Sequence, residues 1–240
     1  MALRFEAVTF EVADADAVAA FWAGLLDRQM LAEPGGVLVP GDELQVGLRF
    51  EASDGKQVGR PRLHVHLTSS SREDQQRTVE TALRLGGRHL DVGQGPDDPH
   101  VVLADPGGNE LCVIEPGNAF LAGCGRLGSI TCEGTREVGY FWSAALGWPL
   151  VWDQDEETAI RAPDRTGPMI TWSGPPLPPK LGRNRWSLAV APLDRAQHDA
   201  EVGRLVALGA TRLDTGDGDR DPIVLADPDG NEFCVVTTWR

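Results

Sequence analysis

Two histidines separated by one residue, His64 and His66, have the type and spacing that most directly suggest chemistry. They fall in a run, residues 62–68, that is typical of a β-strand, where alternate side chains point to the same face. A pair of imidazoles on one face can hydrogen-bond an anionic or phenolic ligand, and one imidazole can act as a general acid or base near neutral pH. The alternative is that both are polar side chains with satisfied hydrogen bonds. Both are therefore candidate catalytic residues, with the structural alternative open.

The cysteines are the other reactive side chains. Cys112, Cys124, Cys132 and Cys234 have neither CxxC spacing nor the density of a disulfide scaffold, so reduced thiols are expected. Cysteine is among the most buried residue types, which favours a core role over a nucleophilic one for Cys112 and Cys234. No spacing between a cysteine and a histidine indicates a catalytic pair.

Composition limits the classes of partner. The formal net charge is −14 and the sequence pI is about 4.7, so no basic stripe is expected for nucleic acid or an anionic membrane. The apolar runs are too short to cross a bilayer, and the N-terminus lacks the pattern of a signal peptide. These features predict a cytoplasmic protein that binds neither nucleic acid nor membrane.

The chain is an internal repeat. Phe21-Trp22 returns as Phe141-Trp142, and the segment 103–113 returns as 225–235 with the shared pattern Leu-Ala-Asp-Pro-x-Gly-Asn-Glu. An offset near half of the 240 residues predicts two equivalent domains, 1–117 and 126–240, joined by a linker at 118–125. Each half has enough apolar residues to bury a core of its own.

Hydrophobic periodicity predicts the order strand, helix, strands four times over, twice in each copy. Asp14 is expected to cap the first helix, Ser71 with Asp74 the second, and Thr135 the third. In the first copy the predicted strands are 3–12, 36–39, 44–50, 62–68, 101–103 and 111–115. In the second copy they are 127–132, 150–152, 159–161, 169–172, 185–190, 223–225 and 233–237.

The doubled Asp-Pro-x-Gly-Asn-Glu segment, together with Phe-Trp in each first helix, resembles the glyoxalase-like branch of the vicinal oxygen chelate superfamily. That superfamily also contains bleomycin-resistance proteins, fosfomycin-resistance enzymes and extradiol dioxygenases. The resemblance covers nearly the whole chain and implies an α+β fold of four βαβββ modules in two tandem domains, whose curved mixed sheets form clefts for ligands. Pro in a tight turn followed by Gly and Asn is itself turn chemistry, so the segment is interpreted as architecture. Glu110 and Glu232 could then be catalytic, but pairing of a turn-end carboxylate with a nearby arginine is the favoured interpretation.

Metal-dependent relatives place a His or Gln on the first strand, a His on the strand that opens the second module, and a Glu on the last strand. Aligned on the motifs, the first-strand position holds Ala7 in one copy and Leu127 in the other. The last-strand position holds Cys112 or Cys234. A shift of two residues brings Phe5 or Thr9, and Glu110 or Ile114, into these places, but still without a full triad.

The remaining ligand position offers His64 or His66 in the first copy, but only Ser187 and Ala189 in the second. At most two ligand-capable groups are therefore expected in any one cleft, which is too few for a metal site. We predict no catalytic divalent ion and no cofactor. If one cleft alone is functional, it is expected to be the one that contains His64 and His66.

The other residues on the inferred inner faces are candidate ligand contacts. Arg49 could hold a carboxylate, although a solvated arginine is the favoured interpretation. Lys56 and Lys180 fall at matching places in the two copies, where each is expected to pin a loop or a subunit contact. The candidate ligand-binding residues are Thr9, Glu11, Arg49, Cys112, Ser129, Thr131, Ser187 and Cys234.

The leading functional hypothesis is metal-independent binding of a small organic molecule, such as an antibiotic or an aromatic metabolite, as the resemblance to drug-sequestering members implies. The alternative is a lyase, isomerase or cyclase in which His64 or His66 is the acid or base. A metal-dependent glyoxalase or dioxygenase is disfavoured by the missing ligands. Because fused halves can replace the pairing of single-domain relatives, either a monomer with an internal pseudo-dimer or a homodimer is expected.

Overall fold

The computed structural model describes residues 3–42, 45–54, 61–95, 97–165, 167–214 and 222–237. The first copy contains two modules. Module 1 consists of β1 (Leu3–Val12), α1 (Ala15–Leu26), β2 (Leu31–Glu33), β3 (Gly36–Val39) and β4 (Gly47–Ala52). Module 2 consists of β5 (Leu63–Leu67), α2 (Arg72–Arg84), β6 (Arg88–His89), β7 (Val101–Ala104) and β8 (Glu110–Val113).

The second copy repeats this order. Module 3 consists of β9 (Leu127–Cys132), α3 (Arg136–Leu146), β10 (Leu150–Gln154), β11 (Glu157–Ile160) and β12 (Met169–Trp172). Module 4 consists of β13 (Trp186–Pro192), the 3-10 helix η1 (Arg195–Gln197), α4 (His198–Ala207), β14 (Thr211–Arg212), β15 (Ile223–Ala226) and β16 (Glu232–Val235). The four predicted βαβββ modules are confirmed.

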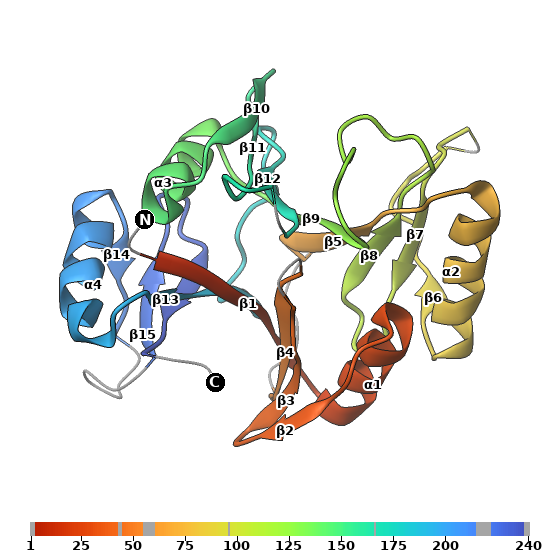
Figure 1. Ribbon diagram of the computed structural model, residues 1–240, viewed down its shortest axis with the longest axis horizontal. Coiled ribbons are helices and arrows are strands. Elements are labelled where there is room, and N and C mark those ends of the chain that lie inside the picture. Colours follow the sequence, from red (N-terminus) through yellow and green to blue (C-terminus); the bar gives the residue numbers. More distant parts are fainter. Residues whose placement is uncertain are drawn as a thin grey trace.

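The described strands form two eight-stranded sheets. Each sheet combines one module from the first copy with one from the second (Figure 1). The first sheet has the order β14-β15-β16-β13-β1-β4-β3-β2, and the second has the order β10-β11-β12-β9-β5-β8-β7-β6. In both sheets the junction is antiparallel, β1 with β13 and β5 with β9, whereas β1 with β4 and β5 with β8 are parallel. These sheets are the curved, mixed sheets expected, but neither is built from a single copy. The first copy alone would leave one edge of β1 and of β5 unpaired, and the second copy alone would leave one edge of β9 and of β13 unpaired.

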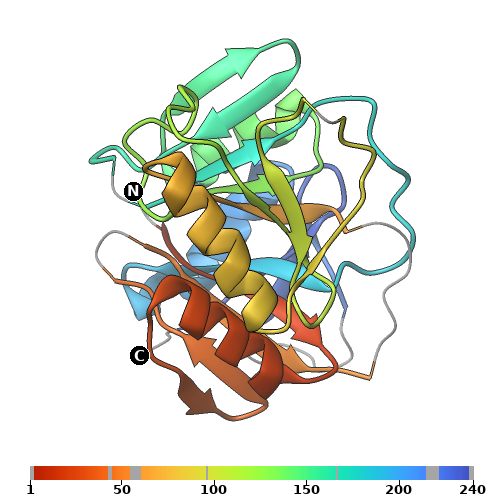
Figure 2. The ribbon, with the colours of Figure 1, turned by 90° about the vertical axis from the view of Figure 1, so that its right-hand side faces the viewer.

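Within each copy, a hydrogen bond between the Trp and the Asp of the repeated motifs joins the two modules. The indole Nε1 of Trp22 donates to Asp105 Oδ2 at 2.9 Å, and Trp142 Nε1 donates to Asp227 Oδ2 at 3.4 Å. Both carboxylates are buried, and burial raises the pKa of Asp105 and raises that of Asp227 to about 6. The turn segment therefore has the architectural role predicted for it. Figure 2 shows the helices α1 and α2 of the first copy lying next to one another.

Two of the three predicted helix N-caps are confirmed. Asp14 accepts a hydrogen bond from Ala17 N, and Ser71 Oγ accepts one from Asp74 N. The carboxylate of Asp74 bonds to Ser70 rather than closing a reciprocal capping box. Thr135 makes no capping bond, because its hydroxyl and backbone N–H both bond to Asp229 of the last turn. A long-range partner thus replaces the expected local cap.

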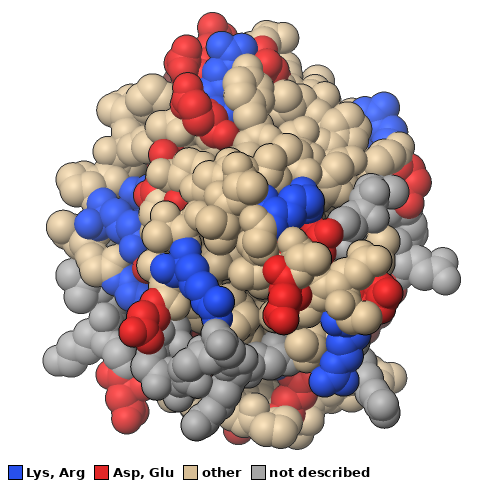
Figure 3. Space-filling view, turned by 90° about the vertical axis from the view of Figure 1, so that its left-hand side faces the viewer, with Lys and Arg blue, Asp and Glu red and all other residues tan. Residues whose placement is uncertain are grey.

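Three very short edge strands, β2, β6 and β14, were not predicted from the sequence. They contain two or three residues each and are mostly exposed, so they carry little hydrophobic periodicity. The main core fills the space between the sheets and the helices and includes Val8, Trp22, Phe50, Trp142 and Phe233. None of the helices in the described ranges has the length and hydropathy needed to cross a membrane. On the face that lies on the left of Figure 1, basic and acidic side chains are interspersed (Figure 3).

Candidate functional site

The candidate residues divide between the inner faces of the two sheets, by which we mean the faces turned away from the helices. Strand register places Thr9 beside both Ser187 and Arg49 in the first sheet. In the second sheet, Ser129 lies beside His66, and Thr131 beside His64. The cysteines occupy matching places, Cys234 beside Ala189 and Cys112 beside His66. The sequence analysis assumed that each copy forms one cleft by itself. In the structure, strands from both copies form each inner face.

A cleft of about 540 Å³ opens on the inner face of the first sheet, and we call it the first cleft. Five predicted residues line it: Thr9, Glu11, Arg49, Ser187 and Cys234. The sequence analysis missed several other lining residues, namely Glu33, Glu51, Arg183, Asn184, Trp186 and Glu232. Alternation along the strand of Arg49 was a signal for Glu51, since residues two apart share a face. Glu33 and Arg183 lie on an edge strand and a loop, whose positions periodicity does not predict.

Arg49 is a buried ion-pair partner and not the solvated side chain that was favoured from the sequence. It is only 4% exposed, and its NH2 lies 2.7 Å from Glu33 Oε2. Burial lowers the pKa of Arg49, and Glu33 opposes that shift. The cost of burying a guanidinium on β4 is offset by this carboxylate from the edge strand β2, which lies beyond β3.

Glu51 is the least compensated charge of the first cleft. Burial raises the pKa of Glu51, the nearby Arg49 lowers it, and Glu11, its register partner on β1, raises it. The side chain of Glu51 has no hydrogen bond or ion pair within the described ranges. This carboxyl is therefore available for a ligand group that donates a hydrogen bond or carries positive charge.

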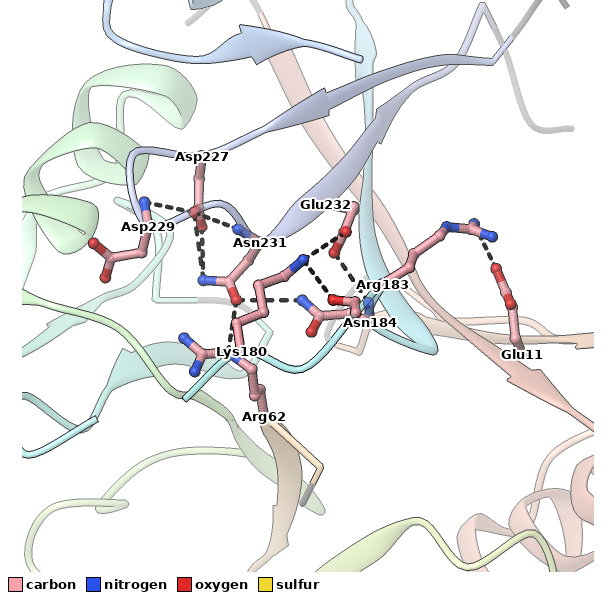
Figure 4. Close-up of polar contacts among 10 residues, drawn as sticks. Glu11, Arg62, Lys180, Arg183, Asn184, Asp227, Asp229, Asn231 and Glu232 are labelled. Carbon is pink, nitrogen blue, oxygen red and sulfur yellow. Dashed lines mark hydrogen bonds and ion pairs between the residues drawn. The ribbon is translucent and has the colours of Figure 1, made fainter. Parts of the chain in front are cut away.

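The proline-rich segment 173–185 borders the first cleft and is held by both copies (Figure 4). Arg183 pairs with Glu11 at 2.5 Å, and Lys180 Nζ lies 2.7 Å from Glu232 Oε1. Asn184 N also donates to Glu232 Oε2 at 3.2 Å. Glu232 therefore pairs with a lysine and not with the arginine that was expected. Lys180 does pin a loop, and Lys56 lies outside the described residues.

A row of polar side chains crosses the inner face of the second sheet. Ser129 Oγ is 3.0 Å from His66 Nδ1 and 3.4 Å from Thr131 Oγ1, which accepts from Thr171 Oγ1 at 3.0 Å. The His64 and His66 rings are 4.8 Å apart between centroids. Desolvation, with smaller contributions from His64 and His100, lowers the pKa of His66 to about 3. His66 is therefore a neutral imidazole held by a hydroxyl of the other copy.

Much of this second inner face is covered. A separate apolar cluster on it joins the strand residues Val102, Cys112, Ala159 and Met169 to Leu121. Leu121 comes from the segment 118–125 that was predicted to be a linker, so this segment covers part of the sheet as well as connecting the copies. His64 retains a side-chain exposure of 26%, and its Nδ1 is 4.0 Å from Glu110 Oε1. Burial, and then the charge of Glu110, raises the pKa of Cys112 to about 12.

A family model described as "Glyoxalase-like domain" matches the chain twice, at residues 7–114 and 129–236. These matches cover most of the sequence. The chain belongs to the glyoxalase-like family.

Solved structures agree on the fold of this glyoxalase-like protein. Glyoxalase I from Zea mays is 15% identical with a TM-score of 0.66, over 98% of this chain and 92% of that one. A putative dioxygenase from Bacillus subtilis is also 15% identical, with a TM-score of 0.62, over 98% of this chain and 85% of that one. Identities this low show that the fold is shared, but they do not show a shared activity. No curated protein sequence matches the chain significantly.

The two inner faces of this glyoxalase-like protein differ in their fitness for a metal ion. In the first cleft, Cys234 lies beside Ala189, and the described residues form no cluster of three potential His, Cys, Asp or Glu ligands there. On the second face, His64, His66 and Cys112 have potential ligand atoms within 4.8 Å of one another. The count of at most two ligand-capable groups in any one cleft is therefore wrong. It assumed that one histidine would occupy a single ligand position, but strand alternation and the parallel register bring both histidines to Cys112.

Proposed function

We propose that this glyoxalase-like protein binds a small organic molecule in the first cleft, without a metal ion in that cleft. The observation that carries the proposal is the volume of about 540 Å³ on the inner face of the first sheet. This is within the usual range, roughly 300–1,000 Å³, for small-ligand sites. The lining combines charged and polar groups with apolar side chains such as Pro34 and Val224, which suits a ligand that has both an apolar and a polar part.

The polar groups favour a hydrogen-bond donor or a cation on the ligand. Glu51 offers a half-buried carboxyl, whereas Arg49 and Arg183 already pair with Glu33 and Glu11. A charge-assisted hydrogen bond from an ammonium group would restore the solvation that Glu51 loses on burial.

The alternative of acid–base catalysis by His64 or His66 has less support. His66 has a pKa of about 3, which is far from the value near operating pH that efficient proton transfer requires. Both histidines also lie on the second sheet, away from the first cleft. Small-molecule binding is therefore the function that the geometry supports best.

Ligand-observed NMR with benzylamine, benzyl alcohol and benzoate would test the proposal on the full chain. Benzylamine is expected to bind more tightly than the other two probes, and EDTA is expected to leave its binding unchanged. Glu51→Gln should weaken benzylamine binding by about ten-fold or more, because it removes the acceptor charge. Glu157→Gln, an exposed glutamate on β11, serves as the matched control and should have no effect.

Two outcomes would contradict the proposal. Equal binding of the three probes, unaffected by Glu51→Gln, would show that the first cleft does not select its ligand as described. Loss of benzylamine binding with EDTA, restored by added metal, would show that binding depends on a metal ion.

A further inference from the structure

We propose that His64, His66 and Cys112 form a binding site for a soft or borderline transition-metal ion, of the Zn²⁺ class, on the inner face of the second sheet. All three residues come from module 2, His64 and His66 on β5 and Cys112 on β8. Their potential ligand atoms lie within 4.8 Å of one another. The site lies outside the first cleft and is independent of the binding proposed there.

The backbone holds this set in place. β5 and β8 are hydrogen-bonded neighbours, and the register pairs His66 directly with Cys112. His64 precedes His66 by two residues and therefore points to the same face. Small adjustments of three side chains, without movement of the strands, would bring the atoms to the distances of about 2.0–2.3 Å that zinc ligands adopt.

The surroundings orient the histidines as ligands. Ser129 Oγ lies 3.0 Å from His66 Nδ1 and is itself supported by Thr131, so Nε2 is the ring nitrogen left for a metal. Glu110 Oε1 lies 4.0 Å from His64 Nδ1, on the side where a carboxylate would orient that ring. Metal-bound histidines commonly use the second ring nitrogen for such a contact with a hydroxyl, a carbonyl or a carboxylate.

The ligand chemistry selects the class of metal. Two imidazoles and one thiolate favour zinc, cobalt, nickel or copper over magnesium or calcium, which prefer oxygen ligands. Binding converts the Cys112 thiol to a metal-bound thiolate and releases one proton to solvent, so charge and atoms balance without any redox change. The partial exposure of His64 gives an ion a route in, and three protein ligands leave a fourth position for water or another ligand.

This arrangement differs from the one that the resemblance implies for metal-dependent relatives, in which the ligands come from two modules and include a glutamate. Here one module supplies all three ligands. The equivalent place in the first sheet provides a natural comparison, because Cys234 there has Ser187 and Ala189 in place of the two histidines. The same cysteine position thus occurs once with imidazole neighbours and once without them.

Titration of the full-length, EDTA-stripped protein with Co²⁺ under reducing conditions would test the site. The expected result is one tightly bound equivalent, with a sulfur-to-cobalt charge-transfer band and visible bands of tetrahedral intensity. Zn²⁺ should abolish these bands, and Mg²⁺ in excess should not. Cys112→Ser should remove the charge-transfer band, whereas Cys234→Ser should retain it.

His64→Ala, a change at a partly exposed position, should weaken Co²⁺ binding by about ten-fold or more and leave the circular dichroism spectrum unchanged. Ser129→Ala should also weaken Co²⁺ binding if Ser129 orients His66. Absence of the charge-transfer band in the wild type, or its persistence in Cys112→Ser, would overturn the proposal. Loss of the band in Cys234→Ser with Cys112 intact would overturn it as well.

Discussion

Arg62 Nε donates a buried hydrogen bond to Asn231 Oδ1 at 3.1 Å, joining residues 169 positions apart in the chain (Figure 4). Arg62 precedes β5 of the first copy, and Asn231 belongs to the last turn of the second. The same guanidinium donates to the carbonyl oxygens of Pro178 at 2.6 Å and Glu133 at 3.4 Å. One side chain therefore ties the first copy to three separate segments of the second.

Replacing Arg62 should destabilise the protein strongly. Arg62→Met is expected to lower the free energy of unfolding by about 2–4 kcal/mol, because it leaves several buried acceptors unsatisfied. Arg77→Met is the matched control, since Arg77 is 67% exposed and pairs with Asp74 at 3.6 Å, and should cost about 0–1 kcal/mol. Urea denaturation followed by circular dichroism would measure both. Equal effects of the two substitutions would contradict the role of Arg62 as a clamp.

Separating the copies should expose the strand edges that they share. Fragments 1–117 and 126–240 each lack the partners of two strands, because β1 pairs with β13 and β5 with β9. Each fragment is expected to self-associate or aggregate, and mixing the fragments should produce a one-to-one complex with the summed mass of the two fragments. Size-exclusion chromatography with light scattering would distinguish these species. A fragment that stays a folded monomer would show that a copy does not need the shared sheets.

Asp227 should make stability depend on pH. Burial raises the folded-state pKa of Asp227 from 3.8 to about 6, so the folded protein binds this proton more tightly than the unfolded chain. The contribution of Asp227 to stability is therefore greatest below about pH 4 and falls as pH rises through about 6, by up to about 3 kcal/mol. Asp227→Asn cannot ionise, so its destabilisation relative to the wild type should shrink over the same interval. Urea titrations at several pH values would measure this difference.

Asp155→Asn supplies the control for the pH experiment, because Asp155 lies in an exposed turn whose left-handed backbone asparagine also tolerates. Measured against this control, the penalty for Asp227→Asn should fall as the pH rises. A penalty for Asp227→Asn that stays constant with pH would contradict the raised pKa of Asp227.

Two helical glycines should respond in opposite ways to substitution by alanine. Gly203 in α4 has open space where a Cβ would lie, so Gly203→Ala should stabilise the protein by about 0.5–1 kcal/mol. In α3, a Cβ on Gly139 would overlap the buried side chain of Thr158, so Gly139→Ala should destabilise it by about 1–3 kcal/mol. Thermal denaturation of the two variants would test this contrast, and a gain in stability from Gly139→Ala would refute the close packing of α3 on β11.

The sequence by itself determined the repeated modules, most of the strands and helices, and the caps at Asp14 and Ser71, because these features depend on local periodicity and on hydrogen bonds between near neighbours. It also showed that His64 and His66 share a strand face, since alternation follows from the pleat. It did not predict which strands pair between copies. β1 and β5 each have an edge that any compatible strand can occupy, and alternation fixes the face of a side chain but not its partner.

Only the tertiary structure therefore assigned the candidate residues to two separate inner faces. It paired Arg49 with Glu33 on an edge strand too short to show periodicity, and it brought Cys112 to His66 through a parallel register across 46 residues of chain. In the same way, the carboxylate of Asp229 replaced the predicted cap at Thr135. In each case the deciding contact joins residues distant in sequence, and its geometry is set by the packing of both copies together.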